Sequence, residues 1–242
     1  MSWAYRIAVV ALIALISVTI NLPASLLRRA VDSDTVQLIA TTGTMWQGSA
    51  EVVALGVTSH LKWQTTATPL GATFVLTHQN SKIGGHLSLG TIQHEIDISG
   101  RIGSSTLAPL LSQYDLFVPG TFELPDTKLL WDTNGPRLRQ PSALQWSGGL
   151  TQYILANRRY EARMPPLVAI LNTTTGGALE AKVKTSQSET EPLLTLRMKT
   201  NNDIYLGVTR GLLRLANYPW SGAEADTALI FEVERALTKT TP

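Results

Sequence analysis

The sequence predicts a mainly β protein, with an N-terminal transmembrane helix followed by a curved antiparallel β-sheet or a sandwich-like domain. Three observations lead to this fold class. One long apolar stretch lies at the N-terminus, short runs of alternating apolar and polar residues fill most of the remainder, and glycine, proline and asparagine separate those runs. With 242 residues, of which 44% are hydrophobic and 16% charged, the chain is long and apolar enough to bury a substantial core.

The apolar stretch runs from Trp3 to Leu22, and Arg6 is its one charged residue. A helix of this length spans about 30 Å, which matches the hydrocarbon thickness of a bilayer. A cleaved signal peptide is the competing interpretation, but the following NLPASLL offers no clear small-x-small cleavage site. We therefore expect an uncleaved single-pass anchor over residues 1–22, with residues 3–22 in the membrane. A large domain after such an anchor is translocated largely regardless of flanking charges, so residues 23–242 are expected outside the cytoplasm.

The segment HEIDISGRI, residues 94–102, is the clearest strand pattern. Isoleucines alternate with charged residues, which predicts a strand with one buried and one solvated face. Gly100 interrupts the alternation and predicts a bulge or bend. Comparable alternation occurs in SAEVVAL, GGHLSLG, ALEAKVKTS and PLLTLRMKT, whereas the pair Gly84-Gly85 predicts a turn. Short helices are expected over residues 23–31 and 105–114.

The chain shows a hint of internal duplication, because Trp46-Gln47-Gly48 and Trp146-Ser147-Gly148 each accompany a strand pattern. A true repeat would divide the domain into halves of similar build, residues 23–118 and 119–242, laid side by side as two β-layers. The match is short, and the spacing after it differs between the two copies. The sequence leaves open whether the domain is one unit or two halves.

Patterns for catalysis, metal binding and nucleic-acid binding are missing from the sequence. Cysteine is absent, which removes thiolate ligands, thiol nucleophiles and disulfides. The four histidines lack the spacing of a zinc protease, and no glycine-rich phosphate loop is present. The net charge of +2 includes no long basic run of the kind that binds nucleic acid. We expect no enzymatic activity, no cofactor, no metal site and no nucleic-acid partner, and the sequence identifies no small-molecule substrate.

The segment TGTMWQGSA, residues 42–50, places a tryptophan between two glycines without any charge nearby. A carbohydrate-binding platform would expose such a ring, whereas a β-core would bury it. A buried indole removes roughly 150–250 Å² from water, and a neighbouring glycine leaves room for the ring to fold over the backbone. We expect this segment to end one strand and begin the next, with Trp46 in the core.

Four motifs in the N-terminal third follow one another: NLPASLL after the apolar stretch, then VQLIATTGTMWQGSA, HLKWQ and TPLG. Together they resemble the type II secretion system protein N family, also called general secretion pathway protein N. The resemblance covers the layout of the whole chain, but it is recognisable as motifs only over residues 21–71. The residues that carry it form a family signature: Pro23, Ala24, Gly43, Thr44, Trp46, Gly48 and Trp63. Their expected role is structural, because the family has no functional residues to transfer.

The resemblance implies a single-pass protein of the inner membrane of a Gram-negative bacterium, with its C-terminal domain in the periplasm. It implies an accessory component of the apparatus that exports folded proteins across the outer membrane. Partners of such a component would be the inner-membrane platform proteins or the secretin. The family is not enzymatic, which agrees with the missing catalytic patterns.

A membrane-anchored carrier of lipid or glycolipid, with an apolar β-groove bridging the periplasm, is the alternative function. Aliphatic residues on both strand faces would favour such a groove, whereas the alternation in HEIDISGRI predicts one solvated face. An anchored glycan hydrolase would instead need two carboxylates that face one cleft. The sequence leaves the secretion component and the lipid carrier open.

Overall fold

The computed structural model describes residues 21–33, 36–67, 70–133, 135–187, 191–201 and 203–236. Within these residues the protein is mainly β and is dominated by a large antiparallel sheet, as the alternating patterns predict. The predicted anchor, residues 1–22, lies outside the described residues except for Asn21 and Leu22. None of the helices in the described part of the chain is long and apolar enough to cross a membrane.

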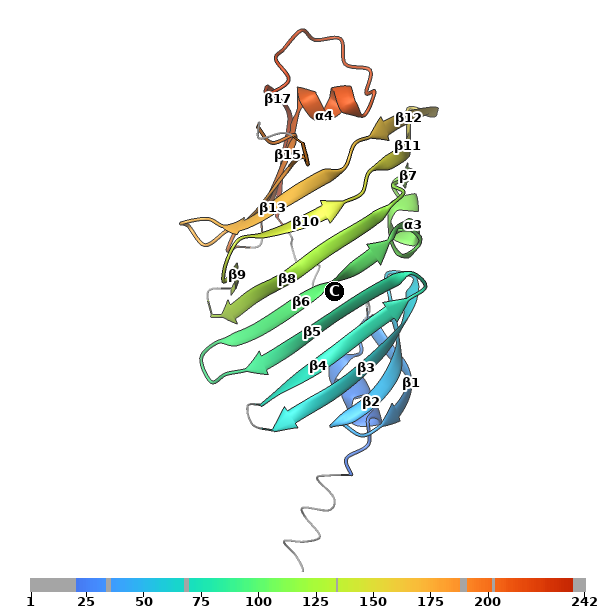
Figure 1. Ribbon diagram of the computed structural model, residues 1–242, viewed down its shortest axis with the longest axis vertical. Coiled ribbons are helices and arrows are strands. Elements are labelled where there is room, and N and C mark those ends of the chain that lie inside the picture. Colours follow the sequence, from blue (N-terminus) through green and yellow to red (C-terminus); the bar gives the residue numbers. More distant parts are fainter. Residues whose placement is uncertain are drawn as a thin grey trace, which may run out of the picture.

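The main sheet contains 14 of the strands that the structure describes, and most spatial neighbours are also neighbours in sequence. In spatial order the strands are β1 (Val36–Gly43), β2 (Gln47–Ala54), β3 (Val57–Ala67), β4 (Leu70–His78), β5 (Ser81–Leu89), β6 (His94–Gly103), β8 (Thr121–Asp132), β10 (Ser142–Trp146), β13 (Leu167–Thr173), β14 (Leu179–Thr185), β15 (Leu194–Met198), β16 (Asp203–Thr209) and β17 (Leu229–Ala236). Strand β9 (Gly135–Leu138) also pairs with β8. The result is a long meander, visible in Figure 1 as strands stacked along the long axis.

A small sheet and three short helices accompany the main sheet. The small sheet has the order β12 (Arg158–Met164), β11 (Gly149–Leu155) and β7 (Leu116–Phe117). The helices are α2 (Ser25–Val31), α3 (Ser104–Ser112) and α4 (Arg210–Leu215). Helix α2 contacts β1 near one end of the molecule, α3 lies along one edge, and α4 lies near the other end (Figure 1). Both helices expected from the sequence, over residues 23–31 and 105–114, are therefore present.

Strand β6 confirms the alternation predicted for HEIDISGRI. Its residue Ile96 lies opposite Leu87 on β5 and Leu129 on β8, so apolar side chains share one face. The register between β6 and β8 shifts between Ile98 and Gly100, which is the predicted bulge. A Cβ at position 100 would lie 2.7 Å from the Cα of Ile83, so only glycine allows this approach.

The turn predicted at Gly84-Gly85 is wrong, because both residues lie within β5. Gly85 is opposite Phe74 of β4, and a Cβ at position 85 would lie 2.6 Å from the ring atom Cζ. The glycine therefore accommodates a ring from the neighbouring strand. A glycine pair indicates close approach as readily as a turn, and the sequence alone does not separate the two.

The main sheet has no break between the two halves considered from the sequence, because β6 and β8, which precede and follow residues 118 and 119, are paired neighbours. Strand β6 pairs with β8 from His94 opposite Trp131 to Gly103 opposite Thr121. The two tryptophan triplets also differ in position, because Trp46 precedes β2 in a turn whereas Trp146 is the last residue of β10. The triplets are therefore not equivalent in structure.

Candidate functional site

One face of the main sheet is apolar from its first strand to its last. In an antiparallel sheet, residues directly opposite one another project from the same face, so the strand registers assign every paired residue to a face. Among the paired residues of the described chain, Arg235 is the one Lys, Arg, Asp or Glu on this face. Representative members of this apolar face, in spatial order, are Leu38, Ala50, Leu61, Phe74, Leu87, Ile96, Leu129, Leu144, Leu171, Ala181, Leu196, Leu206 and Val233.

The opposite face of the main sheet, the polar face, carries most of the charged and hydroxyl side chains of the strands. Its members include Glu51, Lys62, Thr73, Lys82, His86, Asp97, Lys128, Gln145, Lys182, Arg197 and Glu232. The sheet is thus amphipathic, with one face suited to water and the other suited to an apolar environment.

A cavity of about 390 Å³, the central cavity, lies against the middle of the apolar face. Its lining is almost wholly aliphatic and comes from β6, β8, β9, β13, β14 and β15, with Ile98, Leu129, Leu138, Leu171, Leu196 and Met198 among its residues. On a flat sheet, five strand spacings would separate β6 from β15 by roughly 24 Å. One cavity lined by both strands indicates that the sheet bends around it.

The hydroxyl groups beside the central cavity bond to one another. The Thr127 hydroxyl donates to the Pro125 carbonyl oxygen at 2.8 Å, and its oxygen lies 2.5 Å from the Ser142 Oγ. Thr127 is 3% exposed, so these bonds satisfy a buried polar group. The arrangement offers a ligand aliphatic contacts rather than hydrogen bonds.

The end of the apolar face at β1–β3 is closed by α2 and the residues just before it. Ala24, Leu38, Ala50 and Trp63 form a buried cluster there, and Leu27 of α2 packs against it. Ala24 N–H donates to the Gly43 carbonyl at 3.1 Å, next to a bridge between Pro23 and Thr44. Backbone pairing and apolar packing therefore fix α2 over this end of the sheet.

Trp63 occupies the position that the sequence suggested for Trp46. Its indole N–H donates to the Met45 carbonyl at 3.2 Å, and the ring lies over Gly48, which is directly opposite on β2. Trp46 lies in the turn between β1 and β2 and is half-buried. The prediction of a strand–turn–strand is confirmed, whereas the prediction that Trp46 is a core side chain is wrong.

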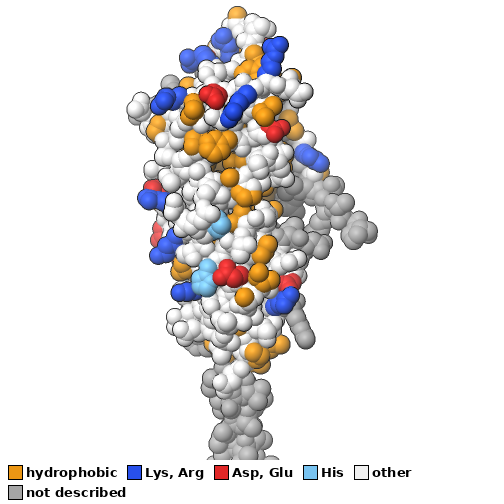
Figure 2. Space-filling model, turned by 90° about the vertical axis from the view of Figure 1, so that its right-hand side faces the viewer, with side chains coloured by type: hydrophobic (Ala, Val, Ile, Leu, Met, Phe, Trp, Pro, Cys, Tyr) orange, Lys and Arg blue, Asp and Glu red, His pale blue; other side chains and the backbone are white. Residues whose placement is uncertain are grey.

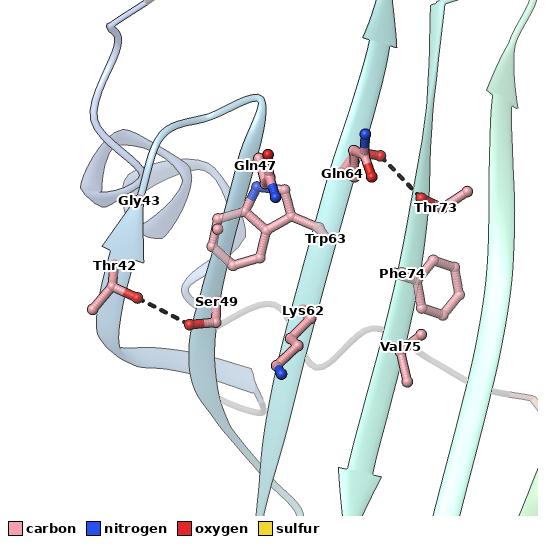
Figure 3. A pocket seen from close by; sticks show the side chains of 11 residues that line it. Thr42, Gly43, Gln47, Ser49, Lys62, Trp63, Gln64, Thr73, Phe74 and Val75 are labelled. Atoms are coloured by element: carbon pink, nitrogen blue, oxygen red, sulfur yellow. Dashed lines mark hydrogen bonds between the residues drawn. The ribbon is translucent and has the colours of Figure 1, made fainter.

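The signature residues thus belong to one structural unit at the α2 end. The Thr44 hydroxyl accepts the backbone N–H groups of Trp46 at 3.3 Å and Gln47 at 3.2 Å, which stabilises the turn. A cavity of about 470 Å³ lies beside this unit and has a mixed lining that includes Thr42, Ser49, Lys62 and Gln64. Figure 3 shows the Trp63 ring pointing toward β2, with Thr42 and Ser49 joined by a hydrogen bond of 2.9 Å.

The small sheet and α4 cover the apolar face where β8, β10 and β13 lie side by side. Trp146, Ala162 and Met164 form a second buried cluster, against which Leu212 and Leu215 of α4 pack. The Trp146 indole N–H donates to the Pro119 carbonyl at 2.7 Å. The chain's own elements therefore cover the apolar face at β1–β3 and around Trp146, whereas Val233 on the last strand, β17, stays 53% exposed.

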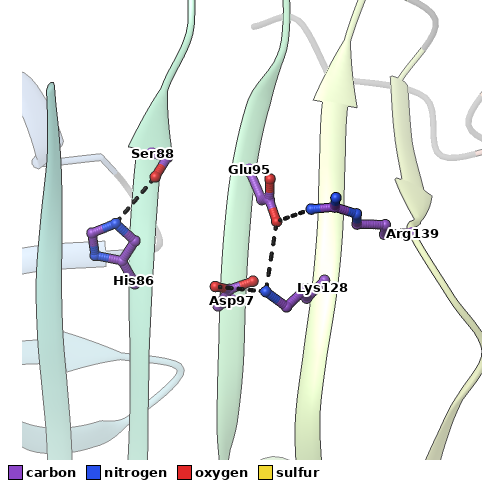
Figure 4. A network of polar contacts seen from close by, with 6 residues as sticks. All are labelled: His86, Ser88, Glu95, Asp97, Lys128 and Arg139. Atoms are coloured by element: carbon purple, nitrogen blue, oxygen red, sulfur yellow. Dashed lines mark hydrogen bonds and ion pairs between the residues drawn. The ribbon is translucent and has the colours of Figure 1, made fainter. Parts of the chain in front are cut away.

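A network of charged side chains lies on the polar face (Figure 4). Arg139 donates to Glu95 at 2.9 Å, and the Lys128 ammonium lies 3.5 Å from Asp97 and 3.9 Å from Glu95. The two carboxylates thus share the Lys128 cation and do not form an acid–base pair that faces a cleft. Side-chain exposures of 29% to 57% place the network at the solvated surface.

His86 and Ser88 come close on β5, with Nε2 3.1 Å from Oγ. The Asp97 carboxylate, on the neighbouring strand, is bound to Lys128 rather than to the imidazole (Figure 4). The residues therefore do not form a serine–histidine–acid relay. In the part of the chain that the structure describes, no group of three His, Asp or Glu side chains is arranged to hold a metal ion.

Glu180 is the most deeply buried carboxylate of the polar face, at 8% exposure. Hydrogen bonds from the Arg197 guanidinium lower its pKa, and the Lys182 ammonium at 3.0 Å contributes in the same direction. Burial opposes these effects without reversing them. Glu180 is therefore a charged structural group that links β14 and β15.

The structure brings all seven signature residues together, with Trp46 joined to the others through its backbone N–H at the turn. Sequence reasoning missed the continuity of the apolar face, although the alternation within each strand was its signal. No protein-family model matches the chain, and neither the curated proteins nor the solved structures contain a match.

Proposed function

We propose that this protein is a membrane-anchored carrier that holds the apolar chain of a lipid or glycolipid against the apolar face of its main sheet. The observation that carries the proposal is the apolar face, which is covered by the chain's own elements around Trp63 and around Trp146 and which also carries the central cavity. Residue Leu196 of that cavity keeps 42% of its surface exposed. Apolar surface in water favours an apolar ligand.

The central cavity has the volume and chemistry of a site for an acyl chain. Its volume of about 390 Å³ falls within the range of roughly 300–1,000 Å³ that is typical of ligand sites. Each methylene group moved from water to such a lining gains about 0.8 kcal/mol. The bonded pair of Thr127 and Ser142 offers little to a charged head group, so the head group is expected to remain in solvent.

In-cell photocrosslinking tests the carrier function with neighbouring positions on one strand. A benzophenone side chain replaces Leu196, which lines the central cavity, or Thr195, which projects from the polar face. We expect lipid adducts, identified by mass spectrometry, from position 196 and none from position 195. Equal lipid labelling at both positions, or no lipid at position 196, would contradict the carrier function.

We propose, as the second candidate, an accessory role in the type II secretion apparatus. The observation that favours it is that the family-signature residues lie close together in the structure. They contact one another around Trp63 and Gly48. In this proposal residues 1–22 anchor the protein in the inner membrane and residues 23–242 form its periplasmic domain. The exposed edge strand β17 would then offer backbone groups for contact with platform proteins or the secretin.

The same crosslinking experiment separates the two candidates. A benzophenone placed at Val233, which is 53% exposed on β17, reports on protein contacts at the sheet edge. Adducts to the secretin or to inner-membrane secretion components would support the secretion role. Lipid adducts at Leu196 without any secretion component at Val233 would leave the carrier as the function.

A further inference from the structure

Large apolar side chains line part of one long edge of the main sheet. Leu70, Leu89, Ile92 and Trp131 are 50%, 42%, 85% and 52% exposed, respectively. We call these four residues the rim. Their exposure is unusual for residues of this size, because tryptophan, leucine and isoleucine normally bury most of their surface.

The strand registers place the rim at one edge and next to the apolar face. Leu89 ends β5 and lies opposite His94, which begins β6 and in turn lies opposite Trp131 near the end of β8. Ile92 lies in the turn between β5 and β6, and Leu70 begins β4 at the same edge. Leu89 and Trp131 project from the apolar face itself, so the rim and the apolar face form one continuous surface.

The rest of this edge has a different composition. The turn from β13 to β14 has the sequence TTGG at residues 174–177, and residues 199–201 after β15 read KTN. Among the described residues, the exposed large apolar side chains of this edge are therefore those of strands β4 to β8 and their turns. These strands belong to the N-terminal half of the sheet. This half is the one that α2 contacts, and it follows the predicted anchor in sequence.

We propose that the rim inserts into the surface of the lipid bilayer and so opens the apolar face directly to the membrane. The inference rests on the proposed carrier function and adds the route by which a lipid chain reaches the groove. A chain that passes from the bilayer over Trp131 and Leu89 meets one polar side chain, His94, which lies between them, and then apolar side chains as far as Leu129 and Ile98 in the central cavity. It passes no Lys, Arg, Asp or Glu side chain on this path.

The chemistry of the rim fits a bilayer better than a protein partner. A stable protein interface covers about 800 Å² on each side, whereas the rim is a narrow row of four side chains at strand ends and a turn. Tryptophan with aliphatic neighbours is typical of the membrane–water interface. The nearby cations are paired, since Arg137 contacts Asp132 at 2.9 Å and Arg139 contacts Glu95 at 2.9 Å. Insertion should therefore not require anionic lipids.

Fluorescence quenching in the full chain tests the proposal, and the absence of natural cysteines allows one label per variant. Ile92→Cys carries a nitrobenzoxadiazole label on the rim. Leu55→Cys is the matched control, because Leu55 is 61% exposed in the turn between β2 and β3 at the opposite edge. Both variants are reconstituted in phosphatidylcholine vesicles that contain a nitroxide-labelled phosphatidylcholine, so the same anchor is present in each.

We expect the label at position 92 to shift its emission to shorter wavelength and to be quenched several-fold more than the label at position 55. Added 0.5 M salt should leave this quenching unchanged. Equal quenching at the two positions would overturn the rim proposal. So would a dimer that forms without lipid and is lost in Ile92→Asp, because the rim would then bind a second copy.

A third variant distinguishes failure of the rim proposal from failure of the proposed carrier function. Leu196→Cys places the label in the central cavity, and spin-labelled stearate is added to the protein. Quenching at position 196 without bilayer quenching at position 92 would overturn the rim proposal and retain the groove. If stearate quenches neither position 196 nor a neighbouring cavity position, the carrier function itself fails.

Discussion

Gly48 lies directly beneath the indole ring of Trp63, and a Cβ at position 48 would come 2.5 Å from the ring atom Cζ2. The two residues are opposite partners on β2 and β3, so the ring can cover the glycine only in this register. The contact joins two signature motifs that lie fifteen positions apart in the sequence. It explains why a small residue and a large ring are needed together at this end of the sheet.

Replacing Gly48 by alanine should destabilise the domain. The added methyl group must displace the Trp63 ring or the backbone of β1, at a cost of about 1–3 kcal/mol. Thermal unfolding of the purified chain measures the effect. Gly84→Ala is the control, because the nearest atom to its new Cβ is the Phe74 carbonyl oxygen at 3.8 Å. Equal losses in the two variants would show that glycine propensity, rather than the ring contact, is responsible.

Removing the Trp63 ring should cost more than removing any exposed tryptophan. Trp63→Ala deletes an 8% exposed indole from the α2-end cluster, and the expected loss is about 3–5 kcal/mol. Trp131→Ala, with its ring 52% exposed, should change the unfolding free energy by about 0.5 kcal/mol or less. Denaturant titration compares the variants. A large loss in Trp131→Ala would mean that the rim contributes to the core.

The hydrogen bond of Trp146 can be tested without removing the ring. Trp146→Phe keeps the stack on Phe122 but deletes the donor to the Pro119 carbonyl, which should cost about 1–3 kcal/mol. Trp220→Phe deletes a comparable bond, from the indole to Glu224 at 2.9 Å, at a ring that is 39% exposed. Water can replace that bond, so the second variant should unfold close to the wild-type temperature. A similar melting temperature for both variants would contradict the buried role of Trp146.

Glu180 should make the stability of the domain depend on acid pH. Its pKa is lowered in the folded state, so its contribution is full above the ordinary glutamate value of 4.5 and is lost as the pH falls toward the lowered value. Glu180→Gln should cost about 1–2 kcal/mol at pH 7 and progressively less below pH 4.5. Thermal melts from pH 3 to pH 7 measure this dependence.

The control for this prediction is Glu161→Gln. Its side chain is 49% exposed and lies 3.8 Å from Arg159, so the charge there is largely solvated. We expect nearly parallel pH profiles for this variant and the wild type. If Glu180→Gln also runs parallel to the wild type, the buried pair with Arg197 does not govern the acid response.

Local patterns were enough to predict the β class and individual strands. In β6, the alternation of isoleucine with charged residues and the bulge at Gly100 follow from the two-residue period of a strand and from the missing side chain of glycine. Both properties act within a few residues. They require no knowledge of which strands become neighbours.

Predictions that depended on which residues face each other across strands were less accurate. The sequence places Trp46 beside Gly48, yet the ring over Gly48 comes from Trp63, because register decides which side chains meet. The sequence left an apolar groove open as an alternative for a related reason. Alternation predicts one apolar face for each strand, but it does not say whether a second layer covers that face or whether it stays open, as it does around Leu196.

The strand order of the main sheet also bears on how the chain folds. From β1 to β6 and again from β13 to β17, each strand pairs with the one made just before it. During synthesis from the N-terminus, almost every new strand can therefore pair with a strand that has already formed. Few contacts depend on residues that are distant in the sequence. A chain truncated at its C-terminus would therefore be expected to form a shorter sheet with one exposed edge strand, rather than to leave several strands unpaired. Folding of this protein is thus expected to proceed from its N-terminal strands to its C-terminal strands.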